Sequence, residues 1–446
     1  MSRPFLILFS FAVGCVCGFA LIPLASPAET KQQGKLGREV ALLREENDRL
    51  RLIVADAERA KKLAAGRKHS DQIEQDVAEI RGLSFDTPVD YNVLDRQQIK
   101  KTIGGKLDEV YSPQEFIDMT HGLAALGLLE PGYALRQSYI DLLGEQVAAF
   151  YDQHQHKLFM FEDATLDNAQ NRIVLAHELT HALQDQHFSL KKLPLEAKDN
   201  DDRSAAAAAL VEGDATLVMS EYMLKNMSLT SLKDTLTTSV TQNMDQLAKA
   251  PRFLREMLIF PYLRGQEFCG ALYGRGGYDA ISKAYATPPT STSQILHPEK
   301  FLSDPREEPI AVSFGDTTAL GQKPIAENTV GEMGVRILIS QWVNDATGEK
   351  AGTGWRGDRY LCYDAGRALA WKTVWANAEE ASEFFDAERA ALEKRHGLTD
   401  GRAEPGHYAA ESPRFVRILT PRPEEVLVID AATAEWADEL VKLFGN

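Results

Sequence analysis

The stretch Asn171–Phe188 reads NRIVLAHELTHALQDQHF, and its apolar residues recur at the spacing of a buried helix. The motif HELTH within it begins at His177 and ends at His181. Side chains four residues apart lie one above the other on a helix, so both imidazoles project from the same face. The alternative is a purely structural helix, but burying two histidines and Glu178 without a partner is costly. The motif therefore predicts a zinc ion held by the two histidines, with Glu178 beside it as a base.

A catalytic zinc ion normally takes three protein ligands and leaves one position for water, so a third ligand is needed. Glu212 lies on a later expected helix in the apolar context LVEGDA, where a buried carboxylate is costly unless it is paired or binds a metal. His187 is the alternative, because it follows His177 at the spacing of the pattern HExxHxxGxxH. That pattern uses a glycine to turn the chain, whereas this sequence has Gln184 there. We therefore favour Glu212.

HELTH followed on a later helix by a glutamate in EGDA resembles the gluzincin metallopeptidases, the group that includes thermolysin. The likeness extends over about residues 146–221 and is confined to motifs. It implies that both motif histidines and Glu212 hold zinc, and that a strand before the motif helix lines the substrate cleft. The family pattern has an aspartate four residues after the ligand glutamate, but this chain has Thr216. Asp214 or Asp185 are the candidates for supporting the ligands instead.

The expected reaction is hydrolysis of peptide bonds in a peptide or protein substrate. Glu178 takes a proton from the zinc-activated water and passes it to the leaving amine. A group that stabilises the oxyanion must come from elsewhere in the chain. The resemblance points to a downstream histidine or tyrosine, and His297 and Tyr262 are the candidates. The alternative roles are structural, as a core aromatic for Tyr262 and a cap for His297.

Two other functions compete with a peptidase. The first is a non-catalytic scaffold of the cell envelope, anchored by a coiled coil, with a structural metal or none. Glu178 argues against it, because a structural zinc site needs no general base. The second is a zinc hydrolase that acts on another amide, such as a peptidoglycan link, and the motif is compatible with that activity too.

Composition narrows the class of protein. The chain has 446 residues, 44% of them hydrophobic, and a formal net charge of −16, so it can build a large core but lacks the basic face of a nucleic-acid-binding protein. Of its four cysteines, Cys15 and Cys17 lie near the N-terminus, while Cys269 and Cys362 are placed to pair in an oxidising compartment. No CxxC occurs, which disfavours a thiolate zinc site.

The N-terminus predicts export. Phe5–Ala25 is uncharged and mostly apolar, and Arg3 precedes it. Such a segment is long enough to span a bilayer, or it is a secretory signal cleaved near residues 26–28. Either reading of residues 1–28 places the rest of the chain outside the cytoplasm, in the cell envelope or secreted. The length of the segment favours an uncleaved membrane anchor.

Residues 29–68 are expected to form a stalk helix. Over residues 36–64 leucines recur at the heptad d positions from Leu36 to Leu50, and Asn47 occupies an a position. A single asparagine at an a position favours a parallel two-stranded coiled coil. The segment therefore predicts a homodimer, the alternative being a solvated helix packed on its own domain.

The rest divides into a metallopeptidase-like domain, residues 69–325, and a small α+β module, residues 326–446. The first is expected to contain strands at 89–94, 146–151 and 157–161, helices at 112–129, 134–144, 204–226, 229–248 and 252–286, and an irregular segment at 287–309. The second is expected to contain helices at 327–344, 378–394 and 434–444, a glycine-rich loop at 348–357, and strands at 360–363, 369–375, 415–419 and 426–429.

The predicted fold is therefore α+β and predominantly helical, with a zincin-like core. Within the C-terminal module, the sequence GWRGDR carries Trp355, Asp358 and Arg359. A loop anchored by the tryptophan, with an ion pair between Asp358 and Arg359, is the favoured interpretation. A contact with substrate or between domains is the alternative.

Overall fold

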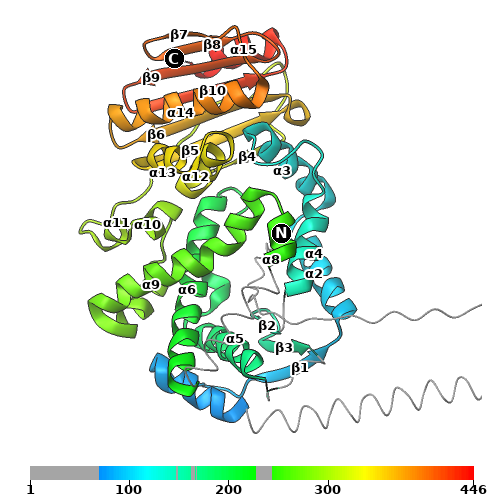
Figure 1. Ribbon diagram of the computed structural model, residues 1–446, viewed down its shortest axis with the longest axis vertical. Helices are drawn as coiled ribbons and strands as arrows, with labels where there is room; N and C mark the ends of the chain where they lie inside the picture. Colours follow the sequence, from blue (N-terminus) through cyan, green and yellow to red (C-terminus); the bar gives the residue numbers. More distant parts are fainter. Residues whose placement is uncertain (1–69, 147–148, 162–165, 167, 228–243, 446) are drawn as a thin grey trace, which may run out of the picture.

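The computed structural model describes residues 70–146, 149–161, 166, 168–227 and 244–445. The apolar segment 5–25, the heptads of 36–64 and most of the expected helix 229–248 lie outside these residues. Within the described ranges, no helix combines the length and apolar composition needed to cross a membrane. The α+β class is confirmed, and Figure 1 shows a large sheet at one end of the molecule and a small sheet beside α5 at the other.

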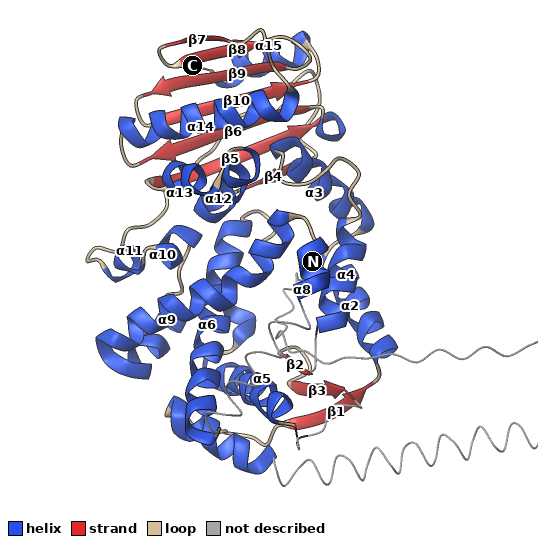
Figure 2. Ribbon diagram, in the orientation of Figure 1, coloured by secondary structure: helices blue, strands red, loops and turns tan. Residues whose placement is uncertain are grey.

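The part that carries the motif is mostly helical (Figure 2). A helix over residues 70–81 begins it. The elements that follow are β1 (Asp90–Leu94), α2 (Arg96–Val110), α3 (Pro113–Leu126), α4 (Leu135–Gln146), β2 (Ala149–Asp152), β3 (Lys157–Phe161), α5 (Ala169–Phe188), α6 (Asp201–Asn226), α8 (Met244–Lys249) and α9 (Arg252–Ala286). The strands form a sheet in the order β1-β3-β2, in which β2 and β3 are the antiparallel hairpin expected before the motif helix and β1 runs parallel to β3.

Local sequence sets the ends of α3. Ser112 accepts a hydrogen bond from the backbone of Glu115 at 3.2 Å, and the Glu115 side chain accepts one from the backbone of Ser112 at 2.7 Å. This reciprocal cap satisfies two amides that the first turn leaves without helical partners. Pro113 fits the first helical position, and Gly127 ends the helix in the left-handed conformation with φ 86°.

The C-terminal part is built on one antiparallel sheet in the order β4-β5-β6-β10-β9-β8-β7. Its strands are β4 (Ala326–Asn328), β5 (Trp355–Tyr363), β6 (Ala368–Trp375), β7 (Arg402–Glu404), β8 (His407–Ala410), β9 (Phe415–Arg422) and β10 (Glu425–Ala431). Its helices are α12 (Gly331–Trp342), α13 (Asp345–Gly352), α14 (Ala378–His396) and α15 (Ala434–Phe444), and the short α10 (Thr292–Leu296) and α11 (Pro298–Leu302) precede it.

Alternate residues of β5 enter two different cores. Tyr360 and Cys362 face a core shared with α3, α12 and α14, whereas Leu361 and Tyr363 face one shared with α15. Side chains of a strand point alternately to opposite faces, so the sheet is covered on both sides. Because α3 joins the first core, residues from the first half of the chain help to cover the C-terminal sheet.

The elements of this part differ from expectation in several places. Residues 345–352 form helix α13 where a glycine-rich loop was expected. A Cβ at Gly348 would lie 2.1 Å from the Ser340 Oγ of α12, so this glycine allows two helices to pack closely. The strands β4, β7 and β8 were not expected, and β4 occupies residues where the expected helix 327–344 was to begin. Figure 2 shows β7 and β8 at one edge of the sheet.

Asp358 has partners other than Arg359. Its carboxylate accepts the indole N–H groups of Trp355 and Trp371, each at 3.0 Å. It also accepts the backbone amides of Val330 and Gly331 at the start of α12, each at 2.8 Å. Arg359 instead pairs with Glu327 and donates to a backbone carbonyl before α6. Asp358 therefore joins β5, β6 and α12, and the expected ion pair with Arg359 is wrong.

The two cysteines in the described residues do not pair. Cys269 and Cys362 are both free thiols and both buried. Cys269 lies on α9 and faces the core shared with α6, while Cys362 lies on β5 and faces the core shared with α3, α12 and α14. The disulfide that the sequence allowed is therefore absent between them.

Candidate metal centre

Helix α5 brings the motif into the interior. It begins after Asn168, whose side chain accepts a hydrogen bond from the backbone of Gln170 at 2.8 Å. Its apolar residues pack against the helix over residues 70–81 and against β2 and β3. The side chains of His177, Glu178 and His181 are at most 2% exposed. A motif this deeply buried needs a partner for its polar atoms.

Glu212 of α6 meets both motif histidines. Its Oε2 lies 3.0 Å from His177 Nε2 and 3.5 Å from His181 Nε2, and the two nitrogens are 3.0 Å apart. In a tetrahedral zinc site with bonds of about 2.0–2.2 Å, ligand atoms lie roughly 3.3 Å from one another. The three atoms therefore already have the separations of three corners of such a site. In the described part of the chain, this is the group of metal-ligand side chains that converges in this way.

Several buried polar atoms around this group have no hydrogen-bond partner within the described residues. They are His177 Nδ1, Glu178 Oε1 and Glu212 Oε1. An unsatisfied buried oxygen or nitrogen costs about 1–3 kcal/mol, so a cluster of them calls for a ligand. Two imidazole nitrogens and a carboxylate oxygen form a donor set that suits zinc. The residues present therefore fit a zinc ion.

The charges at the site are set by burial and by mutual contact. Burial raises the pKa of Glu212, but His181 and His177 outweigh it and bring the pKa down to about 2. Burial alone would lower the pKa of His181, yet Glu212 raises it to about 9. Glu212 is thus held as an anion between two imidazoles. Burial raises the pKa of Glu178 to about 8, with Glu212 adding to the effect and His181 opposing it.

Strand β2 fixes the orientation of Glu178. The backbone N–H of Tyr151 donates to Glu178 Oε2 at 2.8 Å, which leaves Oε1 as the oxygen without a protein partner. Tyr151 is itself held by Asp185, which accepts its hydroxyl at 2.9 Å. β2 lies at the edge of the three-stranded sheet and packs against α5. The hairpin therefore presents one carboxylate oxygen of Glu178 in a defined direction.

Gln184 connects His181 to a second carboxylate. His181 Nδ1 lies 2.9 Å from Gln184 Oε1, and Gln184 Nε2 donates to Asp214 Oδ2 at 3.0 Å. Asp214 also accepts the hydroxyl of Tyr285 at 2.9 Å and pairs with Arg81 at 2.9 Å. Of the two aspartates considered from sequence, Asp214 supports a ligand, through Gln184. Such partners fix the tautomer and ring orientation of a metal-binding histidine.

Close packing of α6 on α9 places Tyr262 at the site. A Cβ at Gly213 would lie 2.1 Å from the carbonyl oxygen of Gly265, so the two backbones touch there. Tyr262, one turn before Gly265, lies with its ring centroid 6.1 Å from that of His177. Part of the residue is exposed, but burial of the hydroxyl and the charges of Glu212 and Glu178 raise its pKa well above the usual value. Tyr262 thus stays a protonated donor.

The other two candidates lie elsewhere. His187 is at the end of α5, where its Nε2 lies 2.7 Å from the carbonyl oxygen of Ser84. His297 directly precedes α11, and its Nε2 lies 2.8 Å from Glu332 and 3.4 Å from Arg336, both on α12. The structure therefore brings together His177, His181 and Glu212 and leaves both of these histidines apart from that group.

Gln184 is the site residue whose role the sequence did not reveal. In the sequence analysis, Gln184 served only as evidence against the pattern HExxHxxGxxH, because it stands where that pattern has a glycine. It lies three residues after His181, within reach on the same helix, and a polar side chain in a buried run is the signal that points to a role. Its partner Asp214 could be found only from the packing of α5 on α6.

Comparison with known proteins reaches only the C-terminal sheet. The family model of a domain of unknown function, DUF8575, matches residues 319–441. No curated protein and no solved structure matches the chain. The matched segment contains α12 to α14, most of α15 and all of the strands from β4 to β10 but not α5 or α6. Functional inference therefore rests on the geometry around His177, His181 and Glu212.

Proposed function

We propose that this protein is a zinc-dependent metallopeptidase of the cell envelope with a gluzincin-type site in a zincin-like core. His177, His181 and Glu212 hold the zinc ion, and Glu178 is the general base. The observation that carries the proposal is the convergence of these three ligand atoms, within 3.5 Å of one another, beside a buried Glu178 oxygen that has no hydrogen-bond partner among the described residues.

Each residue has a distinct task. Bound zinc would acidify a water molecule and polarise the scissile carbonyl. Glu178 takes the proton at Oε1, because Oε2 is occupied by the amide of Tyr151. Gln184 holds His181 in one ring orientation. The hydroxyl of Tyr262, kept protonated and hydrogen-bonded to Glu212, lies beside the ligand group, so we assign oxyanion stabilisation to Tyr262 in preference to His297.

Strand β2 supports a peptide as the substrate. It lies at the edge of its sheet, next to the helix that carries Glu178. An extended chain can add to a sheet edge through main-chain hydrogen bonds, which gives affinity without a fixed side-chain sequence. A substrate strand on β2 would pass close to Glu178. The alternative, an amide of another kind such as a peptidoglycan link, requires purified peptidoglycan as the assay substrate.

The competing scaffold function explains less of the site. A structural zinc ion would use His177, His181 and Glu212 but would leave Glu178 without a task. Keeping a carboxylate with an unpartnered oxygen at 0% exposure is costly, and a general base justifies that cost. We therefore prefer hydrolysis.

We extend the proposal to location and assembly. The apolar segment 5–25 would anchor the chain in the membrane, with the peptidase on the outer side of the bilayer. The heptads of residues 36–64 would join two copies in a parallel coiled coil. Fractionation of cells and cross-linking of the full chain test these two points, and neither depends on the zinc site.

Glu178→Gln is the experiment that tests the proposed reaction, because glutamine keeps the shape of glutamate but takes no proton. We expect zinc content and folding to stay unchanged while cleavage of casein or a peptide library falls by about 100-fold or more. Glu221→Gln, on α6 and away from the ligands, is the control and should leave cleavage unchanged. Undiminished cleavage by the Glu178 variant would remove this residue from the mechanism.

A further inference from the structure

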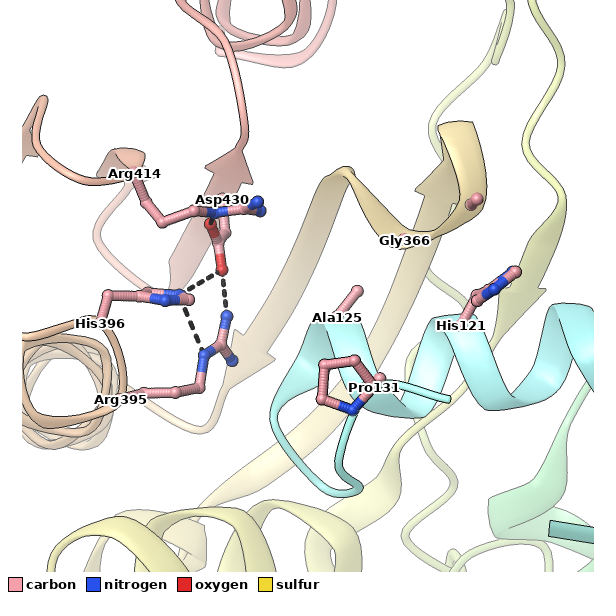
Figure 3. A pocket seen from close by; sticks show the side chains of 10 residues that line it. His121, Ala125, Pro131, Gly366, Arg395, His396, Arg414 and Asp430 are labelled. Atoms are coloured by element: carbon pink, nitrogen blue, oxygen red, sulfur yellow. Dashed lines mark hydrogen bonds and ion pairs between the residues drawn. The ribbon is translucent and has the colours of Figure 1, made fainter. Parts of the chain in front are cut away.

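A charged pocket lies between α3 and the C-terminal sheet (Figure 3), and none of the residues that line it belongs to the candidate metal centre. Its volume is about 150 Å³. One wall comes from the end of α14, from β10 and from the segment before β9, and carries Arg395, His396, Arg414 and Asp430. The opposite wall comes from α3 and the turns beside it.

The charged wall has more positive than negative charge. Asp430 Oδ1 accepts Arg414 Nε at 2.7 Å. Asp430 Oδ2 lies 2.8 Å from His396 Nε2 and also accepts Arg395 Nη2. Guanidinium groups stay charged at any pH a protein meets, so two fixed positive charges face one carboxylate. Setting the histidine aside, the residues that line this wall carry two positive charges and one negative charge, so the wall favours an anion as ligand.

Asp430 is a fixed part of this wall. Its side chain is 1% exposed. Burial raises its pKa, but Arg395, His396 and Arg414 outweigh burial and hold the pKa well below its usual value. The carboxylate thus stays charged and keeps both arginines in place. A prearranged pair of guanidinium groups binds an anion without first losing side-chain freedom.

Arg395 is also fixed from the side of α3. Gly127, the cap of that helix, has φ 86°, and a Cβ there would lie 2.6 Å from Arg395 Nη1. Glycine at this position both ends the helix and makes room for the guanidinium. The position of Arg395 therefore depends on contacts from both halves of the chain.

The opposite wall is mostly apolar. Ala124 and Ala125 of α3 line it with Pro131 and Ala365. His121 Nδ1, on the same helix, is buried and has no hydrogen-bond partner in the described ranges. A cationic wall facing a short apolar wall matches an anion that carries a small hydrocarbon group. The volume and the single excess charge favour a carboxylate over a multiply charged phosphate.

We propose that this pocket binds one small monocarboxylate, with its oxygens on Arg395 and Arg414 and its apolar group against Ala124 and Pro131. A free organic acid and the C-terminus of a peptide share this chemistry. Both would place a carboxylate on the guanidinium groups, where charge-assisted hydrogen bonds are strongest. The proposal does not depend on the zinc site.

The test is calorimetric titration of the full chain with propionate and with its uncharged analogue propionamide. We expect saturable binding of propionate and none of propionamide. Arg414→Gln should weaken propionate binding by about tenfold or more, since it removes a charged donor. Arg422→Gln is the matched control on β9, because Arg422 is 72% exposed and pairs with Glu425 outside the pocket. The affinity of the Arg422→Gln variant for propionate should equal that of the wild type.

A second variant tests the same proposal if Arg414→Gln fails to fold. Ala124→Leu leaves every charge in place but fills the pocket from α3, so it should also weaken propionate binding. Equal binding of propionate and propionamide, tighter binding of inorganic phosphate than of propionate, or no saturable binding would each overturn the proposal.

Titration with N-acetyl-alanyl-alanine and with its C-terminal amide distinguishes the two sources of the carboxylate, a free organic acid and the C-terminus of a peptide. Tighter binding of this peptide acid than of propionate favours a peptide terminus, and the reverse favours a free acid.

Discussion

Asp358 and Glu212 are both buried carboxylates, but their surroundings differ. Asp358 receives four N–H groups, two from tryptophans and two from the backbone of α12. Glu212 meets two histidines that also contact each other, and one of its oxygens has no partner in the described residues. A carboxylate whose lone pairs are filled holds elements together. A carboxylate such as Glu212, whose oxygen lies close to two imidazoles, is arranged to bind a cation together with them.

The largest expected effect concerns Asp358. Asp358→Asn keeps the shape but turns an amide N–H₂ toward two N–H donors, which leaves those donors unpaired. We expect the free energy of unfolding to fall by about 3 kcal/mol, because each buried unsatisfied group costs about 1–3 kcal/mol. Zinc content per folded chain should not change. Urea denaturation with metal analysis measures both, and a loss of zinc without a loss of stability would break the contrast with Glu212.

A somewhat smaller effect is expected where α6 and α9 touch. Gly265→Ala places a Cβ 2.2 Å from the carbonyl oxygen of Ala209, so the helices must separate. We expect a loss of about 2 kcal/mol in the free energy of unfolding, and weaker zinc binding because Tyr262 and Glu212 shift apart.

Gly270→Ala is the matched control on the same helix. Its Cβ would meet nothing within 4 Å, and the residue is exposed. Alanine is more favourable than glycine in a helix interior, so the free energy of unfolding of this variant should rise by about 0.5–1 kcal/mol. Opposite signs for the two glycines, measured by urea denaturation, would support the packing that places Tyr262. Equal effects would contradict it.

Glu388 of α14 is a third buried carboxyl group to compare with Asp358 and Glu212, and its substitution is expected to change the free energy of unfolding by less. Its Oε2 is buried and has no hydrogen-bond partner among the described residues, as at the metal centre, but Glu388 is not part of the metal-ligand cluster found in those residues. Burial raises its pKa from 4.5 to about 8, with Arg395 opposing and Asp430 adding to the rise. A raised pKa in the folded state means that Glu388 contributes stability below pH 4.5, which is lost as the pH rises through 8.

Glu388→Gln should remove this dependence on pH. The variant's advantage in unfolding free energy over the wild type should grow by more than about 1 kcal/mol between about pH 5 and 8. Asp386→Asn, on the exposed face of the same helix, is the control and should show no such growth. Urea denaturation at several pH values makes the measurement. An advantage that does not change with pH would show that Glu388 does not titrate in this range.

Local sequence was sufficient for the elements that build the site. The periodicity of 171–188 predicted α5, whose observed bounds are Ala169–Phe188, and the two short strands predicted at 146–151 and 157–161 are observed as β2 and β3. Glu212 could be singled out because its neighbours in LVEGDA are apolar. These signals arise within one helix or hairpin and do not depend on distant parts of the chain.

Signals that depend on packing between elements were missed. Gly348 suggested a loop, yet it serves the close contact of α13 with α12. His297 was named as a catalytic candidate, but its contact with Glu332 arises only when α11 meets α12. The link from Gln184 to Asp214 likewise requires α5 to lie on α6. Such partners are far apart in sequence, and periodicity carries no information about them.

The most direct test of the central claim is the metal content of the purified chain, prepared without chelators, for the wild type, Glu212→Ala and His187→Ala. We predict about one zinc ion per wild-type chain, lost in the Glu212 variant and kept in the His187 variant. His187 is the matched control because its imidazole contacts Ser84 and lies apart from the ligand group. No bound zinc in the wild type, or loss of zinc with His187→Ala and not with Glu212→Ala, would contradict the account.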